Sequence, residues 1–369
     1  MPGNREYDDR PAAHVRGRGA QLNPPNRFEP VRLSVLGEYM DELARELPHG
    51  HQHPTHVYHD TARSIINRVD APDMPFDWTI NPYRGCEHGC IYCYARPTHE
   101  NFGLSCGLDF ETQIFAKLDA PALLRKELAH PKWTAEYILM SGVTDPYQPI
   151  ERSLRITRDC LEIMAECRQP VAIITKHRMV TRDLDLLAQL AEHRAVRVTI
   201  SLTTLDAHLA RSMEPRASAP NARLEAIAKC AHAGIPTMAM IAPIIPGLND
   251  QEIPALLRAA KESGAQSAAY TLLHMPHQVS ELFLDWLQRE WPLQASKVEA
   301  RIRATRAGAL SDERFGKRLR GTGAHAEQIQ NLFRVHARKL GLDKAPPSLS
   351  GAAFLRPTLL GQPNQPGLF

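Results

Sequence analysis

The feature that most constrains the fold is an alternation of short apolar runs and longer amphipathic stretches, which starts near residue 76. Strands are predicted at 78–81, 137–141, 171–176, 196–203, 237–244 and 267–273, and helices near 119–130, 157–168, 181–193, 221–233 and 250–263. Asn249 and Glu252 are spaced like a capping box at the start of the last helix, and Gly264 ends it. Six strands that alternate with helices favour parallel βα units with right-handed crossovers. The pattern therefore predicts an α/β domain whose sheet is either open or closed into a barrel.

The strand predicted at 196–203 gives a clue to what its sheet encloses. Apolar residues alternate along it with polar ones, which are Arg197, Thr199, Ser201 and Thr203. One face of the strand is therefore apolar and the other polar. Buried hydroxyl groups need hydrogen-bond partners, so a polar ligand explains this face better than a hydrocarbon core does. A half-exposed edge strand is the alternative.

Directly after the first predicted strand, residues 81–97 read NPYRGCEHGCIYCYARP. Cys86, Cys90 and Cys93 have the spacing C-x3-C-x2-C in this glycine-containing segment. Three thiolates form a soft site that favours zinc, copper(I) or iron–sulfur chemistry. A structural zinc usually takes a second ligand pair, and the sequence has no second C-x2-C. Three thiolates on a four-iron cluster leave one iron open to a ligand that is not protein. The alternatives to such a cluster are a zinc site and buried thiols that bind no metal.

The segment resembles the cysteine loop of the radical S-adenosylmethionine (SAM) superfamily, in which three cysteines at this spacing hold a 4Fe-4S cluster and an aromatic residue, here Tyr92, precedes the third. The resemblance spans roughly residues 76–275 and is nearest to uncharacterised bacterial proteins similar to spore photoproduct lyase. SGVTDPYQPIE, TKHRMVTRD and LEAIAKCAHAGIPTMAMIAPIIPGLND carry it, together with the cysteine loop. It implies a partial (β/α)6 TIM-type barrel with its active site at the carboxyl ends of the strands.

The resemblance also implies where SAM binds. Residues 141–145 follow the second strand, where the superfamily has a glycine-rich segment for the SAM amino group. This chain departs from the usual Gly-Gly-Glu form of that segment. Thr144, Asp145 and Glu151 are therefore alternatives for the amino-group contact.

Other strand ends supply the remaining SAM contacts that the resemblance implies. Lys176 is expected to pair with the SAM carboxylate, Ser201 and Thr203 with the ribose hydroxyls, and Ile244 with the adenine. The predicted SAM-binding residues are Tyr92, Ser141, Gly142, Thr144, Asp145, Lys176, Ser201, Thr203, Arg216 and Ile244.

In this superfamily one electron enters the cluster, and SAM is cleaved to methionine and a 5′-deoxyadenosyl radical that abstracts hydrogen from a substrate. The resemblance implies a flavodoxin- or ferredoxin-type electron donor. Spore photoproduct lyase uses a further cysteine as hydrogen donor. Cys106 is the candidate here, because Cys160, Cys167 and Cys230 lie in helical patterns typical of buried small side chains. Lesion repair is not implied, and the substrate stays open, with nucleic acid among the alternatives.

The predicted elements divide the chain into four parts. We expect an N-terminal extension over residues 1–70, a core over 71–277, a helical segment over 278–345 and a proline-rich loose tail over 346–369. In the extension, residues 1–30 are either a solvated arm or a segment that wraps the domain, and 31–47 have helical spacing. His49, His51, His53, His56 and His59 favour an exposed loop over a metal site. In the helical segment, Ile329, Leu332, Phe333 and Leu340 form one amphipathic face, which ends at Gly341.

Charge and composition add two expectations. The net charge of +3 does not by itself indicate a class of binding partner. Residues 296–345, however, contain twelve Lys or Arg and five Asp or Glu. This surplus is either a nucleic-acid footprint or the solvated face of ordinary helices. A nucleic-acid-binding protein with a purely structural metal loop is thus the rival interpretation. The polar N-terminus and the need for reduced thiols predict the cytoplasm.

Overall fold

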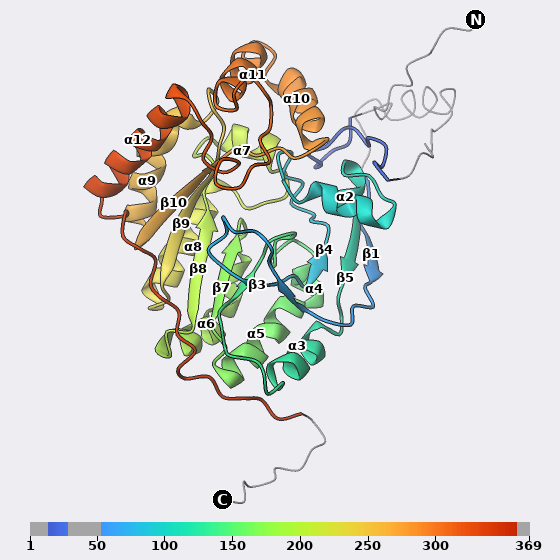
Figure 1. Cartoon of the computed structure of the whole chain (residues 1–369), viewed down its shortest axis with the longest axis vertical. Coiled ribbons are helices and arrows are strands. Elements are labelled where there is room, and N and C mark those ends of the chain that lie inside the picture. The colour runs from blue at the N-terminus through green and yellow to red at the C-terminus, as the bar shows by residue number, and fades with distance from the viewer. Residues whose placement is uncertain (1–13, 29–52, 360–369) are drawn as a thin grey trace, which may run out of the picture.

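The computed structural model describes residues 14–28 and 53–359, which form a mixed α/β fold (Figure 1). The main sheet has the strand order β10-β9-β8-β7-β6-β3-β2. Its strands are β2 (Ile66–Arg68), β3 (Trp78–Ile80), β6 (Ile138–Met140), β7 (Val171–Thr175), β8 (Val196–Ser201), β9 (Thr237–Ile244) and β10 (Ser267–Leu272). Every neighbouring pair is parallel except β2 and β3. The predicted α/β class and its six parallel strands are confirmed.

Helices follow the parallel strands in the predicted order. They are α3 (Ala120–Leu128), α4 (Glu151–Leu154), α5 (Ile156–Cys167), α6 (Leu184–Glu192), α7 (Ala207–Met213), α8 (Pro220–His232) and α9 (Ile253–Glu262), with the 3-10 segments η2 (Arg178–Asp183) and η3 (Asp250–Glu252). Ile173, Ile200 and Ile241 on the strands and Leu161 and Leu257 on the helices are buried in one core. Cys160, Cys167 and Cys230 are buried there too, as predicted.

Strand β8 lies in the middle of the main sheet, between β7 and β9, so the edge-strand alternative is wrong. Val196, Val198 and Ile200 are buried on one face, and Thr199 and Ser201 are buried on the other. Both faces of the strand are therefore covered. Ser201, on the polar face, is the last residue of the strand.

The capping box predicted for α9 is wrong. Both carboxylate oxygens of Glu252 accept bonds from the end of the β8 loop, at 2.6 Å from Thr204 Oγ1 and 2.8 Å from the Leu205 amide. Asn249 instead binds Ile245 N at 2.6 Å and Thr203 O at 2.8 Å. The two side chains thus join the carboxyl ends of β8 and β9 and do not cap the helix.

A second, three-stranded sheet was not predicted. It has the order β1-β5-β4, from β1 (His56–His59), β4 (Tyr83–Arg84) and β5 (Gln113–Ala116), and it adjoins η1 (Arg96–Phe102) and α2 (Leu108–Thr112). The loop expected around His56 and His59 is therefore a strand, although its four residues are exposed. His49, His51 and the helix expected at 31–47 lie outside the described residues.

Residues 14–28 pack against the core, so the solvated-arm alternative is wrong for this part of the extension. Val15, Arg18, Ala20 and Gln21 are buried. The Gln21 side chain closes the segment on itself, accepting from Val15 N at 2.7 Å and donating to Val15 O at 3.0 Å. The segment wraps the domain, as the other alternative stated.

The C-terminal part contains α10 (Val279–Glu290), α11 (Ala295–Ala304) and α12 (Ala324–Lys339). Ile329 and Phe333 bury the predicted face of α12, and the Phe333 ring lies 4.6 Å from that of Tyr270 on β10. The following segment is not loose up to residue 359, because Ser350 N bonds Arg194 O at 3.0 Å and Leu355 N bonds Cys167 O at 2.8 Å. Among residues 14–28 and 53–359, no helix has the length and apolar character needed to cross a membrane.

Candidate functional site

The cysteine loop, residues 85–93, lies over the carboxyl ends of the parallel strands. Backbone bonds tie both of its sides, from Cys86 N to Phe110 O at 3.0 Å and from Ile91 N to Met213 O at 3.0 Å. Thr144, which follows β6, donates to Gly85 O at 2.6 Å. The loop is thus anchored to α2, to the end of α7 and to the loop after β6.

A buried carboxylate, Glu111 of α2, fixes the loop to the N-terminal segment. It accepts from Gly19 N at 3.0 Å, from Ala20 N at 2.8 Å and from Arg96 at 2.5 Å. Arg96 is itself fully buried and donates to Cys90 O at 3.0 Å. A charged pair without solvent is tolerated only when its remaining bonds are made, and here those bonds hold the backbone at Cys90.

A second carboxylate, Glu87, holds the loop from the opposite side. It accepts from Ile150 N at 2.7 Å and Thr55 Oγ1 at 2.8 Å, and it pairs with Arg216 at 3.1 Å. Its amide donates to Gln148 at 2.9 Å. Side chains from three separate parts of the chain therefore fix the loop at the position next to Cys86.

The three loop cysteines are free thiols, and their surroundings fit a metal cluster. Burial and the charge of Glu214 raise the pKa of Cys90 well above its ordinary value, and burial and Cys86 raise that of Cys93 to about 11. Such thiols become thiolates when a cation compensates their charge. In the part of the chain that the structure describes, no three His, Cys, Asp or Glu side chains surround one ion position. A cluster does not need such a position, because each thiolate binds a different iron.

The polar residues at the ends of β7 and β8 meet at Glu214, which lies directly after α7. This fully buried carboxylate accepts from Tyr92, from Arg223 and, at 2.6 Å, from Thr203. The Nζ atom of Lys176 lies 3.8 Å from it. Burial opposes its ionisation, but Arg223 and Lys176 lower its pKa to about 2. We call Tyr92, Lys176, Thr203, Glu214 and Arg223 the Glu214 cluster.

The Glu214 cluster gathers several of the predicted SAM residues on one side of the cysteine loop. Lys176 Nζ lies 5.8 Å from the centre of the Tyr92 ring and 3.5 Å from Ala242 O. Ser201 is buried beside it, and its carbonyl accepts from Arg223 at 3.1 Å. Ile244 is buried at the end of β9, the next strand. Glu214 and Arg223 were not among the predicted site residues, since only their place after β8 marked them.

Among the other predicted SAM residues, Thr144, Asp145 and Arg216 contact the cysteine loop itself. Asp145 accepts from Thr175 Oγ1 at 2.7 Å and from Lys176 N at 2.8 Å, and it lies 3.4 Å from His88. Gly142 O accepts from Tyr94 at 2.7 Å. Ser141 Oγ bonds Thr144 O at 3.3 Å, Arg216 pairs with Glu87, and Glu151 accepts from Arg182 at 2.7 Å. Their oxygens and nitrogens already take part in holding the loop and α4.

Cys106, the candidate hydrogen donor, is a buried thiol outside this cluster. Its Sγ atom donates to Gln278 Oε1 at 3.6 Å, and it packs with residues of α10. Burial raises its pKa to about 12. It is a neutral thiol in a packed environment.

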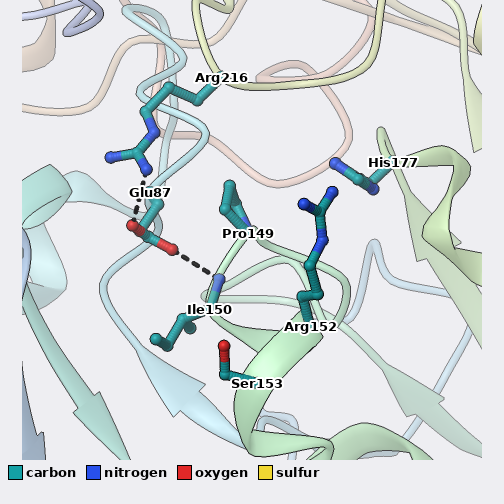
Figure 2. A pocket seen from close by; sticks show the side chains of 7 residues that line it. All are labelled: Glu87, Pro149, Ile150, Arg152, Ser153, His177 and Arg216. Atoms are coloured by element: carbon teal, nitrogen blue, oxygen red, sulfur yellow. Dashed lines mark hydrogen bonds and ion pairs between the residues drawn. The ribbon is translucent and has the colours of Figure 1, made fainter.

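Two histidines that the sequence did not single out stack beside the loop. His88, between Cys86 and Cys90, and His177, after β7, have parallel rings 5.5 Å apart. Burial opposes a charge on His88, but Asp145 and Cys86 raise its pKa to about 10, whereas burial and His88 lower that of His177 to about 4. His177 also lines a pocket of 490 Å³ (Figure 2).

Comparisons with known proteins agree with the fold and the loop. The family model described as "Radical SAM superfamily" matches residues 80–260. The uncharacterized protein Rv2578c of Mycobacterium tuberculosis is 36% identical over 245 residues, which are 65% of this chain and 72% of that protein. The uncharacterized protein MJ0683 of Methanocaldococcus jannaschii is 31% identical over 193 residues, which are 52% of this chain and 68% of that protein.

Among solved structures, spore photoproduct lyase complexed with dinucleoside spore photoproduct has a TM-score of 0.55 at 16% identity, over 77% of this chain and 79% of the lyase. A variant of the lyase with bound AdoMet and the same dinucleoside has a TM-score of 0.54 at 15% identity, over 83% and 92% of the two chains. At this identity the likeness shows a shared fold.

Proposed function

The chain belongs to the radical SAM superfamily, and from this premise we propose that Cys86, Cys90 and Cys93 hold its cluster and that the Glu214 cluster holds its SAM. Membership makes the protein an enzyme whose cofactors are a 4Fe-4S cluster and SAM. The observation that carries the assignment of residues is that Tyr92, from the cysteine loop, bonds Glu214, which Lys176 also approaches at 3.8 Å. One group of side chains thus joins the thiols to the end of β7.

When bound, the cluster and SAM supply reductive cleavage to a 5′-deoxyadenosyl radical that abstracts hydrogen from a substrate carbon. The chain's own residues bind and orient. Lys176 is the cation for the SAM carboxylate, and Glu214, ionised at neutral pH, keeps its ammonium group in place. Thr203 is held by Glu214 at 2.6 Å and by Ala242 O at 3.1 Å, so its hydroxyl has a fixed orientation.

Superfamily membership makes the chain an enzyme, so a nucleic-acid-binding protein with a purely structural metal loop is not the proposed function. Lesion repair is also left out, because the Cys106 thiol bonds Gln278, packs with residues of α10 and lies outside the Glu214 cluster. The proposed reaction is hydrogen abstraction from a substrate. The electron that reduces the cluster beforehand comes from a flavodoxin- or ferredoxin-type donor.

Anaerobic reconstitution tests the proposal. We expect about four iron per chain, a visible absorption band, and release of 5′-deoxyadenosine when SAM and dithionite are added. Replacing Cys86, Cys90 and Cys93 by Ala should abolish all three. Cys230→Ala, at a buried thiol of α8, is the control and should keep them. Iron and 5′-deoxyadenosine in the triple variant would refute the proposal.

A further inference from the structure

A pocket of 490 Å³ lies beside the cysteine loop, on the side of α4 and the start of η2 (Figure 2). Neither the cluster thiols nor the Glu214 cluster line it. Its walls come from the cysteine loop, the residues around α4, the residue after Lys176 and the residue after Pro215. They are Glu87, Pro149, Ile150, Arg152, Ser153, His177 and Arg216.

The pocket is positively charged. Glu87 is its one lining carboxylate among the described residues, and Arg216 neutralises it at 3.1 Å. Arg152 and Arg178, both exposed, are close enough to His177 to lower its pKa. Among the described residues neither guanidinium has a hydrogen-bond or ion-pair partner. Arg152, which lines the pocket, and Arg178, the chain neighbour of the lining residue His177, are two unneutralised charges that attract an anionic partner.

The pocket is joined to the cluster site by packed rings. His177 lines it, and its ring stacks 5.5 Å from that of His88, which sits in the sequence between Cys86 and Cys90. His88 is buried, and its Nε2 atom has no hydrogen-bond partner among the described residues. His177 accepts from Met179 N through Nδ1 at 3.0 Å, so its ring is held in place. Two fixed rings therefore span the distance from the surface to the cysteine loop.

The partner approaches from a different side than SAM. Lys176 and His177 are neighbours in the chain, but Lys176 contacts Glu214 and Ala242 O, whereas His177 faces the pocket. A molecule in the pocket therefore meets the cysteine loop without entering the Glu214 cluster. This position suits a protein that delivers an electron better than one that carries the substrate carbon.

We propose that this pocket, with Arg152 and Arg178, docks an acidic one-electron carrier protein, and that the His88–His177 pair is the packed route from it to the cluster. The inference rests on the proposed function, and it adds the place of electron entry. One electron leaves the reduced carrier, which becomes oxidised, and enters the oxidised cluster, which becomes reduced. No bond forms or breaks in either histidine, and no atom is transferred.

Reduction kinetics of the reconstituted enzyme test the docking site. The probes are reduced flavodoxin, an acidic carrier, and reduced methyl viologen, a small cation. In the double variant Arg152→Glu/Arg178→Glu, we expect the second-order rate constant with flavodoxin at low salt to fall at least about tenfold. The rate with methyl viologen should not fall. Added salt should lower the rate constant of the wild type with flavodoxin and reduce the difference in rate between the wild type and the double variant.

Arg258→Glu is the matched control, because Arg258 is exposed on α9, which packs on β9 and α12 and away from α4. It should keep the wild-type rate with flavodoxin. An equal fall in both variants, or none in the double variant, would overturn the docking site. If the double variant kept that rate but lost binding to a single-stranded oligonucleotide, the pocket would be a nucleic-acid site and the inference would be wrong.

Two variants of His177 test the route. His177→Asn keeps an acceptor for Met179 N but removes the ring, and His177→Phe keeps a ring that can stack. We expect the limiting reduction rate at saturating flavodoxin to fall at least about tenfold in the first and to stay near wild type in the second. Equal limiting rates in all three proteins would overturn the route. If methyl viologen failed to support SAM cleavage in the wild type, the proposed function itself would fail.

Discussion

At the scale of single residues, Glu214 connects more of the site than any other side chain named above. Replacing it by Gln leaves Arg223 as a buried cation, and Lys176 as a partly buried one, without their carboxylate. Loss of one member of a buried pair costs about 3 kcal/mol in the free energy of unfolding. We expect urea unfolding of Glu214→Gln to show this loss. Glu225→Gln, at an exposed residue of α8, is the matched control and should unfold as the wild type does.

Lys176 belongs to the same cluster, but its loss should affect binding more than folding. Its Nζ is partly accessible and lies 3.5 Å from Ala242 O. A charge-assisted contact to a carboxylate is worth about 2 kcal/mol, so Lys176→Ala should weaken SAM binding roughly thirtyfold. Equilibrium dialysis of reconstituted protein measures this. Lys229→Ala on α8 is the control, and equal SAM affinity in the two variants would contradict the assignment of Lys176.

His99 gives the fold a pH dependence near neutrality. Burial lowers its pKa from 6.5 to about 4, and its Nε2 lies 2.8 Å from Gln113 O. Because the pKa is lower in the folded state, the unfolded chain binds more protons between these values. Its contribution to stability is therefore complete above pH 6.5 and is lost as the pH falls toward 4.

From pH 7 to pH 5 the wild type should lose about 2 kcal/mol more stability than His99→Gln, whose amide still reaches Gln113 O but does not titrate. Urea unfolding of cluster-free protein at both pH values provides the comparison. Parallel losses in the two proteins would show that His99 does not titrate in this range.

The sequence indicated that polar residues follow the strand ends, but not which way each side chain turns. Lys176 and Thr203 both approach Glu214, because they follow the parallel neighbours β7 and β8. Asp145 and Arg216 come from equally suitable positions, yet they contact His88 and Glu87 on the other side of the loop. The side of the loop that each side chain contacts depends on long-range partners such as Glu87. No periodic pattern in the sequence marks Glu87 as such a partner.

At the scale of elements, the N-terminal segment 14–28 and the cysteine loop behave as one unit. A Cβ atom on Gly19 would lie 1.9 Å from Gly89 O, while Gly89 itself has a φ of +66° and faces Glu111. Such a contact forces one of the two backbones to move. We expect Gly19→Ala to lose about 2 kcal/mol of stability and to bind less iron on reconstitution.

Gly17→Ala separates this contact from backbone strain. Gly17 has a φ of +70°, and a Cβ atom added to it would meet nothing within 4 Å, so its replacement costs about 1 kcal/mol through conformation alone. Its iron content should equal that of the wild type. Equal iron in the Gly19 and Gly17 variants would mean that the segment does not support the cluster site.

Elements were predictable where hydrophobic period and length agree. The strand at 237–244 was predicted with its observed ends, and α5 and α8 were displaced by one residue. The strands β1, β4 and β5 were not predicted because each has only two to four residues, which is too short for a clear alternating pattern. Packing of residues 14–28 against the domain was one of two alternatives, but its contacts were not predicted because the bonds to Glu111 span more than ninety residues.

At the scale of the whole molecule, the two described ends of the chain serve opposite ends of the sheet (Figure 1). Residues 14–28 hold the cysteine loop at the carboxyl ends of the strands, through Glu111. The segment after α12 runs to the amino ends of the strands, where Leu355 N bonds Cys167 O at the end of α5. Stability and cofactor binding should therefore be separable by truncation.

Ending the chain at Lys344 removes the C-terminal segment and leaves α12 whole. The lost bonds include Ser350 N to Arg194 O at 3.0 Å and Arg356 to Leu128 O at 3.2 Å and Trp133 O at 3.1 Å. At about 1 kcal/mol for each of two or three net bonds, the truncated protein should lose about 2 kcal/mol. Its iron content and 5′-deoxyadenosine release should match the wild type, because none of these contacts reaches the cysteine loop. Loss of iron without loss of stability would reverse the assignment of the two ends, and urea unfolding beside iron analysis distinguishes the outcomes.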